Sequence, residues 1–530
     1  GDGGGVSIAD FNNDGWPDIY LANAEEDVLL RNDGGTSFTD ITSGSGLEVS
    51  LASRTMTGSW GDYDDDGYVD LYLSQHIPTG GNGAANATQR DFLFHNNRNE
   101  TFTDVSSLLD TLHLQGYGAI GGWTDFDLDG DLDILLVNDC DPSSSDPNER
   151  IGTKLFRNDG GGIPSDWAFE EVALFSGIND CRAGRGLAIG DYNRDGWPDY
   201  FYTNTGDCVL YENNGNSSLT DVSSTSGING QASTHSSWGT SFWDYDNDGW
   251  QDLNVAMGAE GGLGAGLALA NQVYHNNGDG TFTEVATSLG LADSRKTRNI
   301  VYGDYDNDGD LDAFVVNYGE GCSLMRNELD NDNHYLKVDL VGNTSNRDGI
   351  GAQLTVLTPD GVSRFFETRS GSNLGGGDAT SAHFGLGTQS TVQRLIIRWP
   401  SGTEQVLENF PANDHLTITE NNVNSFTDVS FISGVDLIHD GVSFPDMTVG
   451  SGAAWFDYNR DGLLDLYVTM RTAANLLYEN NGDGTFTEKA QALGAEDAGG
   501  NGAGVAIADF NNDGWPDIFI ANGERDVLLK

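Results

Sequence analysis

Short apolar stretches recur along the chain in pairs, and each pair is separated by a nine-residue acidic loop. Stretches such as "GVSIADF" and "RGLAIGDY" precede the loops, and "DIYLAN" and "DILLVN" follow them. Two β-prone segments joined by a tight polar loop predict a β-hairpin. A third stretch such as "LLYENN", a Gly-containing turn and "TFTEV" usually follow, which adds two strands. The pattern therefore predicts four-stranded antiparallel units of about 50–65 residues.

The spacing of the loops predicts how these units are organised. The loops begin at residues 10, 62, 125, 191, 244, 304, 457 and 509, and one interval is much longer than the others. Repetition at this period with four strands per unit is typical of a β-propeller, and a linear stack of sheets is the weaker alternative. We expect an all-β chain with six propeller blades in 1–333, a separate small all-β domain in 334–423, and one blade plus the start of another in 424–530. Seven blades would make the complete propeller.

The loops share the pattern D-x-[DN]-x-D-G-x-x-D, which is suited to a metal ion. Residues 1, 3 and 5 of a tight loop can direct oxygens at one centre, a glycine at position 6 turns the chain, and a later acidic residue completes the shell. Because the ligands are all oxygen and mostly charged, they select Ca²⁺ over zinc or copper. Solvated Asp-Gly turns are the alternative for a single loop, but eight copies favour seven or eight Ca²⁺ ions, each also bound by the backbone carbonyl at position 7. The predicted ligands are Asp10, Asn12, Asp14 and Asp18; Asp62, Asp64, Asp66 and Asp70; Asp125, Asp127, Asp129 and Asp133; Asp191, Asn193, Asp195 and Asp199; Asp244, Asp246, Asp248 and Asp252; Asp304, Asp306, Asp308 and Asp312; Asp457, Asn459, Asp461 and Asp465; and Asp509, Asn511, Asp513 and Asp517.

The charge of the chain supports bound cations. There are 82 Asp and Glu against 25 Lys and Arg, a formal net charge of −57, and 28 of the acidic side chains occupy the predicted ligand positions of the eight loops. Such self-repulsion opposes compaction unless cations offset it. The acidity argues against nucleic-acid or anionic-membrane partners, and no apolar run approaches the length of a membrane span.

The hairpins resemble FG-GAP/VCBS-type repeats, the propeller blades also found in integrin α-subunit heads. Residues 334–420 contain "NRDGIGA", "HFGLG" and "WPSG" in order, and they resemble the ASPIC/UnbV domain of the cartilage-acidic-protein family. The resemblance implies a secreted or cell-surface protein with calcium on the aspartates named above.

The order of the segments departs from that family. Residues 1–31 align without gaps on 500–530 with 23 identities, so loops 10 and 509 look like the same blade in successive units. The alternative is one propeller with two similar blades. If 424–530 begins a new unit, the six blades before it lack their seventh, and copies of the chain would complete one another head-to-tail. Internal closure within one chain is the rival arrangement.

These features predict an extracellular, calcium-stabilised structural protein, as a tandem-repeat or polymeric surface fibre. A secreted integrin-like adhesion or glycan-binding receptor, with surface glycans or matrix proteins as partners, is the alternative. No GxSxG, Walker, HExxH or dinucleotide motif is present, so we expect no enzyme. His95 and His275 are expected at exposed blade positions. Cys181 is expected to pair with Cys208, with Cys140 as its rival partner.

Overall fold

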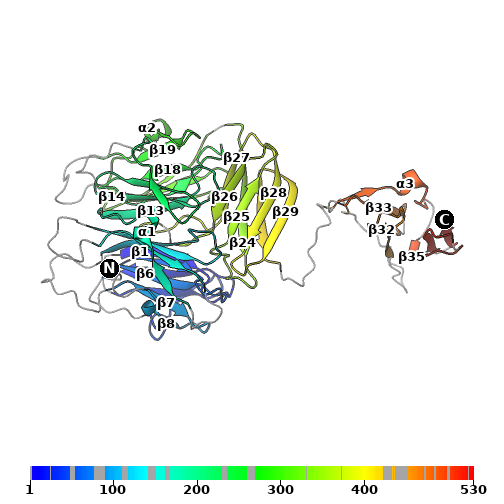
Figure 1. Cartoon of the computed structure of the whole chain (residues 1–530), viewed down its shortest axis with the longest axis horizontal. Helices are drawn as coiled ribbons and strands as arrows, with labels where there is room; N and C mark the ends of the chain where they lie inside the picture. The colour runs from blue at the N-terminus through cyan, green and yellow to red at the C-terminus, as the bar shows by residue number, and fades with distance from the viewer. Residues whose placement is uncertain are drawn as a thin grey trace. The chain divides into compact units, whose positions relative to one another are not determined.

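The computed structural model describes residues 3–23, 26–47, 54–76, 90–109, 117–140, 151–160, 167–228, 236–258, 269–329, 331–371, 373–421, 433, 435, 452–470, 473–482, 485–497, 502–511, 513–522 and 525–530. The chain divides into two compact units, Gly1–Ser425 and Phe426–Lys530. Both are built from β-strands (Figure 1), which confirms the predicted all-β class. The described helices are single turns, α1 (Ala173–Ser176), α2 (Ala286–Leu289), α3 (Ala490–Leu493) and the 3₁₀ turn η1 (Ser106–Leu108), and none is long enough to cross a membrane.

Six antiparallel sheets follow one another in the first unit, and in each the strands lie in chain order. Sheet 1 is β1 (Gly3–Ala9), β2 (Asp18–Asn23), β3 (Val28–Asn32) and β4 (Phe38–Asp40); sheet 2 is β5 (Arg54–Gly61), β6 (Asp70–His76), β7 (Phe92–Asn96) and β8 (Phe102–Asp104); sheet 3 is β9 (Gly118–Thr124), β10 (Asp133–Asn138), β11 (Lys154–Asn158) and β12 (Phe169–Glu171). Sheet 4 is β13 (Gly184–Gly190), β14 (Asp199–Asn204), β15 (Val209–Asn213) and β16 (Leu219–Asp221); sheet 5 is β17 (Phe242–Trp243), β18 (Asp252–Val255), β19 (Gln272–Asn276) and β20 (Phe282–Glu284); sheet 6 is β21 (Thr297–Gly303), β22 (Asp312–Asn317) and β23 (Ser323–Met325). The predicted four-stranded units are thus confirmed for sheets 1 to 5.

Consecutive sheets bury their apolar faces against each other. Trp60, on the first strand of sheet 2, is fully buried beside Phe11 and Tyr20 of sheet 1. Similar clusters join each later sheet of the series to the one before it. Because aromatic side chains bury large areas, these interfaces supply most of the core between sheets.

Residues 334–420 fold as two sheets packed face to face. One contains β24 (His334–Val341), β27 (Ala382–Gly387) and β30 (Asp414–Thr419), and the other contains β25 (Gln353–Leu357), β26 (Ser363–Glu367), β28 (Thr391–Arg398) and β29 (Glu404–Pro411). The module has its own apolar core, which includes Leu336, Val356, Leu395 and Trp399. It belongs to the same compact unit as sheets 1 to 6 and lies alongside them in Figure 1.

The second unit contains two further antiparallel sheets. The first is β31 (Ala453–Phe456), β32 (Asp465–Val468), β33 (Leu476–Asn480) and β34 (Phe486–Glu488), and the second is β35 (Gly502–Ala508), β36 (Asp517–Asn522) and β37 (Val527–Leu529). Tyr467 and Leu477 of the first sheet pack against Ile518 and Ile520 of the second.

Candidate metal centres

Each acidic loop connects the first two strands of a sheet. The residue before the loop pairs with the ninth loop residue across the hairpin, as Ala9 pairs with Asp18 and Gly190 with Asp199. This register places the first and ninth loop aspartates side by side at the end of every hairpin.

The first aspartate organises the loop by accepting two backbone N–H groups. In the first loop, the Oδ1 of Asp10 accepts the N–H of Asp14 at 3.0 Å and its Oδ2 accepts that of Gly15 at 2.6 Å. Both bonds recur in the loops that begin at Asp62, Asp125, Asp191, Asp244, Asp457 and Asp509, and the first of them recurs at Asp304. The sixth residue has φ between 86° and 106° in all eight loops, a conformation that requires glycine.

The ninth aspartate is held by an asparagine on the third strand, which the sequence analysis did not single out. In sheet 4, the Asn213 N–H donates to Asp199 Oδ1 at 2.8 Å. Its side-chain amide donates to the carbonyl of Phe126, the second loop residue of sheet 3, also at 2.8 Å. Asn96, Asn158, Asn276 and Asn327 make the corresponding pair of bonds, each to the preceding sheet. This asparagine therefore fixes both a predicted ligand and the contact between neighbouring sheets.

Several loops bring their predicted ligands within reach of one ion. Three carboxylate oxygens lie within 4.8 Å of one another in the sets Asp62, Asp64 and Asp66; Asp125, Asp127 and Asp133; and Asp244, Asp246 and Asp248. In the loops with an asparagine at position 3, that side chain donates to the aspartate at position 5; these pairs are Asn12 with Asp14, Asn193 with Asp195, Asn459 with Asp461, and Asn511 with Asp513.

The electrostatics of the loops fit a cation. Burial raises the pKa of Asp70 and of Asp191 to about 7, and burial together with nearby Glu367 raises that of Asp125 to about 8. Among the residues that the structure describes, four buried ligand oxygens have no hydrogen-bond partner: Asp18 Oδ2, Asp64 Oδ1, Asp127 Oδ1 and Asp199 Oδ2. Buried, unpartnered carboxylate oxygens are costly, and a bound Ca²⁺ would satisfy them.

The 334–420 module binds the loops directly. The Asp348 carboxylate accepts the N–H of Asp10 at 2.7 Å, and Glu367 accepts that of Asp125 at 2.8 Å. The Lys337 ammonium lies 3.4 Å from Asp304 Oδ2. Loops of three different sheets are thus tied to one module.

The segment that follows β26 reaches the first strands of several sheets. Ser370 donates to the carbonyl of Ile8 in sheet 1, and Arg369 donates to that of Ile189 in sheet 4, each at 2.5 Å. Asp378 accepts the N–H of Tyr302 in sheet 6 at 3.1 Å. These contacts connect sheets that are distant in the sequence.

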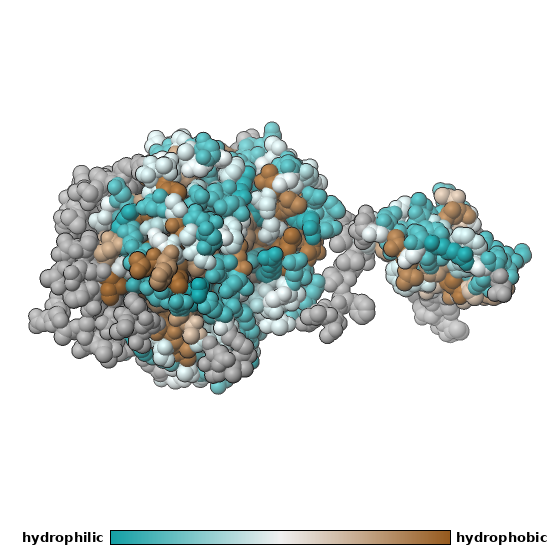
Figure 2. Space-filling model, viewed as in Figure 1, coloured by the Kyte–Doolittle hydropathy of each residue, from teal (hydrophilic) through white to brown (hydrophobic). Residues whose placement is uncertain are grey.

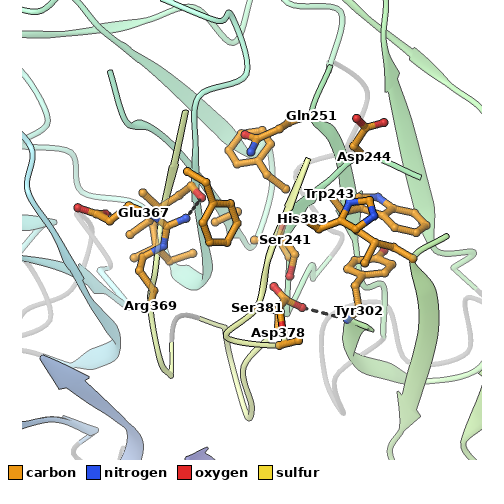
Figure 3. A pocket seen from close by; sticks show the side chains of 18 residues that line it. Ser241, Trp243, Asp244, Gln251, Tyr302, Glu367, Arg369, Asp378, Ser381 and His383 are labelled. Carbon is orange, nitrogen blue, oxygen red and sulfur yellow. Dashed lines mark hydrogen bonds and ion pairs between the residues drawn. The ribbon is translucent and has the colours of Figure 1, made fainter. Parts of the chain in front are cut away.

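A cavity of about 90 Å³ lies between the module and sheets 4 to 6, which is room for a few water molecules. Figure 3 shows Glu367 and Arg369 on one side of it and Trp243, Tyr302 and His383 on the other. Burial lowers the pKa of His383 to about 4, so the ring is neutral near neutral pH. The cavity is a gap with a mixed polar and apolar lining within the interface between the module and the sheets.

Two histidines are placed differently from the prediction. The Nδ1 atom of His95 lies 3.3 Å from Asp70 Oδ1 and 3.4 Å from Asp64 Oδ2. The Nδ1 atom of His275 is hydrogen-bonded to Asp252 Oδ1 at 3.1 Å and lies 3.7 Å from Asp246 Oδ2. Both side chains are half-buried against a loop, so their predicted exposure is wrong. The approach occurs across a hairpin, between residues more than twenty positions apart, which the local sequence pattern does not show.

The disulfide also differs from the first expectation. Cys140 is bonded to Cys181 with a Cα–Cα distance of 5.0 Å, while Cys208 is buried and free. The pairing of Cys181 with Cys208 is therefore wrong, and the rival pairing is present. It follows from the contact between sheets 3 and 4, where Cys140 N donates to the carbonyl of Arg182 at 2.9 Å.

Comparison with known families agrees with this architecture. A model of FG-GAP-like repeats matches residues 10–73, 125–201, 191–255, 244–315 and 457–520, together more than half of the chain. The chain therefore belongs to the family of FG-GAP-like repeat proteins, and a model of ASPIC and UnbV matches residues 342–425.

Among curated proteins, the chain is similar to cartilage acidic protein 1. It is 39% identical to the Xenopus tropicalis protein over 85 residues, which are 16% of this chain and 13% of that protein. It is 43% identical to the Homo sapiens protein over 58 residues, 11% of this chain and 9% of that protein. The matches thus span a small part of either relative, while they confirm the resemblance drawn from the sequence motifs.

Among solved structures, an Agrocybe aegerita lectin that recognises non-reducing terminal N-acetylglucosamine is 15% identical, with a TM-score of 0.35. The likeness covers 91% of this chain and 92% of the lectin. At that TM-score it carries no argument about this chain.

Proposed function

We propose that this chain is an extracellular structural protein that binds Ca²⁺ in seven or eight acidic loops and assembles head-to-tail. The observation that supports calcium binding most strongly is the shared backbone frame of the loops, with a positive-φ glycine in all eight and paired N–H bonds to the first aspartate in seven. The FG-GAP-like repeats and the similarity to cartilage acidic protein 1 favour an extracellular location. The proposal assigns the chain no catalytic role.

Sheets 1 to 6 are proposed to form an incomplete propeller that takes one more blade. On sheet 6, Tyr305, Phe314 and Leu324 are 42–54% exposed, whereas the corresponding Phe11, Tyr20 and Leu29 of sheet 1 are at most 1% exposed beneath sheet 2. The two sets hold the same places in the register, namely loop position 2 and the facing pair in the second and third strands.

The opposite end of the series is also uncovered. Ile8 of sheet 1 is 48% exposed, while Trp60, at the same place in sheet 2, is completely buried. The Asn32 side chain donates to the carbonyl of Pro17 in its own sheet, whereas the matching asparagines of sheets 2 to 6 donate to a carbonyl of the preceding sheet. Both ends therefore present surfaces that in the other sheets are interfaces between blades. Apolar patches separated by polar surface are visible in Figure 2.

The β31–β34 sheet has the features of the blade that would fill this gap. Trp455 corresponds to Trp60 and is 57% exposed. Asn480 corresponds to the inter-sheet asparagines, but its side-chain amide donates to the carbonyl of Leu464 in its own sheet. We propose that this sheet from one copy packs against sheet 6 of another copy, with the Asn480 amide donating to the Tyr305 carbonyl. Sheet 1 would then take the place of the β35–β37 sheet, to which it is nearly identical in sequence.

The head-to-tail assembly is tested by electron microscopy and light scattering of the full chain. Wild type should form concentration-dependent oligomers or filaments, Leu324→Asp should be monomeric, and the control Leu174→Asp, on an exposed turn outside the proposed interface, should behave as wild type. Cross-linking of a mixture of isotopically light and heavy chains distinguishes contacts between copies from contacts within one. A monomer whose residues 425–530 cross-link only to their own chain would refute the fibre.

A secreted adhesion or glycan-binding receptor is the alternative function. Trp16 and Trp515 lie in loops and are nearly half exposed, and such aromatic surfaces can stack on sugars. Binding of a monomeric chain to a glycan array, lost on substitution of Trp16 by alanine, would favour this alternative.

A further inference from the structure

Two of the eight loops differ chemically from the others because a histidine faces their carboxylates. His95 lies on β7 and His275 on β19, in each case just before the inter-sheet asparagine. The same position holds Arg31, Arg157, Arg326, Glu212 and Glu479 in other sheets. Arg31 and Arg157 instead form ion pairs with acidic side chains of the outer strands and turns, such as Glu100 and Glu170.

The ring nitrogen of His95 is positioned as a third ligand atom. Its Nδ1 and one oxygen each of Asp64 and Asp70 all lie within 4.8 Å of one another, and the same holds for His275 with Asp246 and Asp252. The nitrogen–oxygen separations at His95 are 3.3 and 3.4 Å. Ligand atoms about 2.1 Å from a metal and 90–110° apart are separated by roughly 3.0–3.4 Å, so this spacing suits a small dication.

A second observation points to a bound ion at the His95 site. The Asp64 side chain is only 6% exposed, and its Oδ1 has no hydrogen-bond partner. The His95 Nδ1 atom is buried and also lacks a hydrogen bond of acceptable geometry. An ion bound between His95 Nδ1 and the Asp64 carboxylate would give both groups a partner. At the second site, His275 Nδ1 lies at hydrogen-bond distance, 3.1 Å, from Asp252 Oδ1, and a bound ion would replace that contact.

We propose that the loops of sheets 2 and 5 form a second class of metal site, which binds a transition-metal dication through histidine Nδ1 and carboxylate oxygens. Imidazole nitrogen favours first-row transition metals such as Mn²⁺, Co²⁺ or Zn²⁺, while the all-oxygen loops favour Ca²⁺. The inference rests on the proposed metal binding of the loops. It assigns two of the eight loops to a transition metal and leaves six for Ca²⁺, so it revises the number of calcium ions proposed above.

The test uses the full chain, stripped of metal and then incubated with Co²⁺ in the presence of excess Ca²⁺. Metal analysis should find two Co²⁺ per chain, with the remaining loops holding Ca²⁺. His95→Arg and His275→Arg should each lose one Co²⁺, with at least tenfold weaker binding, and they should keep the wild-type melting temperature in Ca²⁺ because sister loops carry arginine there. His415→Gln, which changes a surface histidine paired with Asp339, is the matched control and should retain both ions.

A spectroscopic measurement separates ligation from mere orientation of the carboxylates. With Mn²⁺ as the probe, pulsed electron paramagnetic resonance should detect directly bound ¹⁴N in the wild type and none in the double variant. Ca²⁺ in every loop without retained Co²⁺, or Co²⁺ binding unchanged in both variants, would overturn the inference and leave the calcium proposal standing. Absence of both metals would overturn both.

Discussion

As the pH falls, the free energy of unfolding should rise for the metal-depleted protein and fall for the calcium-bound protein. The perturbation is depletion of Ca²⁺, followed by a change from about pH 8 to about pH 5. Burial holds the pKa of Asp70 and of Asp191 at about 7 and, with Glu367, that of Asp125 at about 8, against 3.8 for an unperturbed aspartate. Because these folded-state values lie above the unfolded value, the folded chain binds more protons, and its stability rises as the pH falls through about 8 to 7.

The size of the effect follows from these pKa values. One carboxyl with a folded pKa of about 7 and an unfolded pKa of 3.8 adds about 2–3 kcal/mol to the free energy of unfolding between pH 8 and pH 5. Carboxylates within one loop are coupled, so one proton per loop is the appropriate count. Five loops contain such a carboxyl, with pKa values raised by burial to about 7 or 8 at Asp18, Asp70, Asp125, Asp191 and Asp252. Together they would contribute on the order of 10 kcal/mol, which is comparable with the whole stability of a domain. The metal-free chain should therefore be largely unfolded near pH 8 and regain structure near pH 5.

The assay is urea unfolding followed by tryptophan fluorescence, on metal-depleted and on Ca²⁺-loaded protein at each pH. Ca²⁺ and protons compete for the same carboxylate oxygens. Because protons displace Ca²⁺ as the pH falls, the loaded protein should lose stability. Metal-depleted protein that is as stable at pH 8 as at pH 5 would refute the reasoning. A free energy of unfolding that changes with pH in the same direction for both forms would also refute it.

Three further outcomes are expected. At neutral pH, chelation should lower the melting temperature substantially, because ions bound only by the folded state stabilise it by mass action; identical melting curves would contradict this. Asn213→Ala, which removes the bond to Phe126 of the preceding sheet, should cost about 1–3 kcal/mol in urea unfolding and more than Asn32→Ala, whose amide bonds within its own sheet. Replacing Cys140 and Cys181 by serine should cost roughly 2–4 kcal/mol, and peptide mapping without reduction should recover the pair linked.

The sequence predicted those features that are local. Each loop is specified within nine residues, because the glycine at position 6 and the aspartates at positions 1 and 9 act within one hairpin, and the structure shows the same frame eight times. The alternating apolar stretches likewise specify each sheet. The ligand roles of the aspartates remain predictions.

The features that sequence analysis missed depend on contacts between sheets. Asn213 reaches a carbonyl 87 positions away, and His95 approaches Asp70 only after the third strand has paired with the second. Cys140 meets Cys181 because sheets 3 and 4 are adjacent, which no spacing rule provides. A signal for the asparagine was nevertheless present, since "NN" or "RN" ends the third strand of almost every repeat.

The 334–420 module covers the acidic loops but directs too few cations at them to neutralise their charge. Lys337 faces Asp304. Burial lowers the pKa of the Arg364 guanidinium, although the nearby carboxylates of Asp244 and Asp248 act to raise it. Other cations of the module pair with its own acids, as Arg394 does with Glu408. The cations directed at the loops are therefore far fewer than the 28 carboxylates at the predicted ligand positions. In addition, Asp348 and Glu367 bring further negative charge to the same face. A module that adds acids to an acidic surface is stable there only if diffusible cations offset the repulsion, so we expect its docking and metal binding by the loops to be coupled.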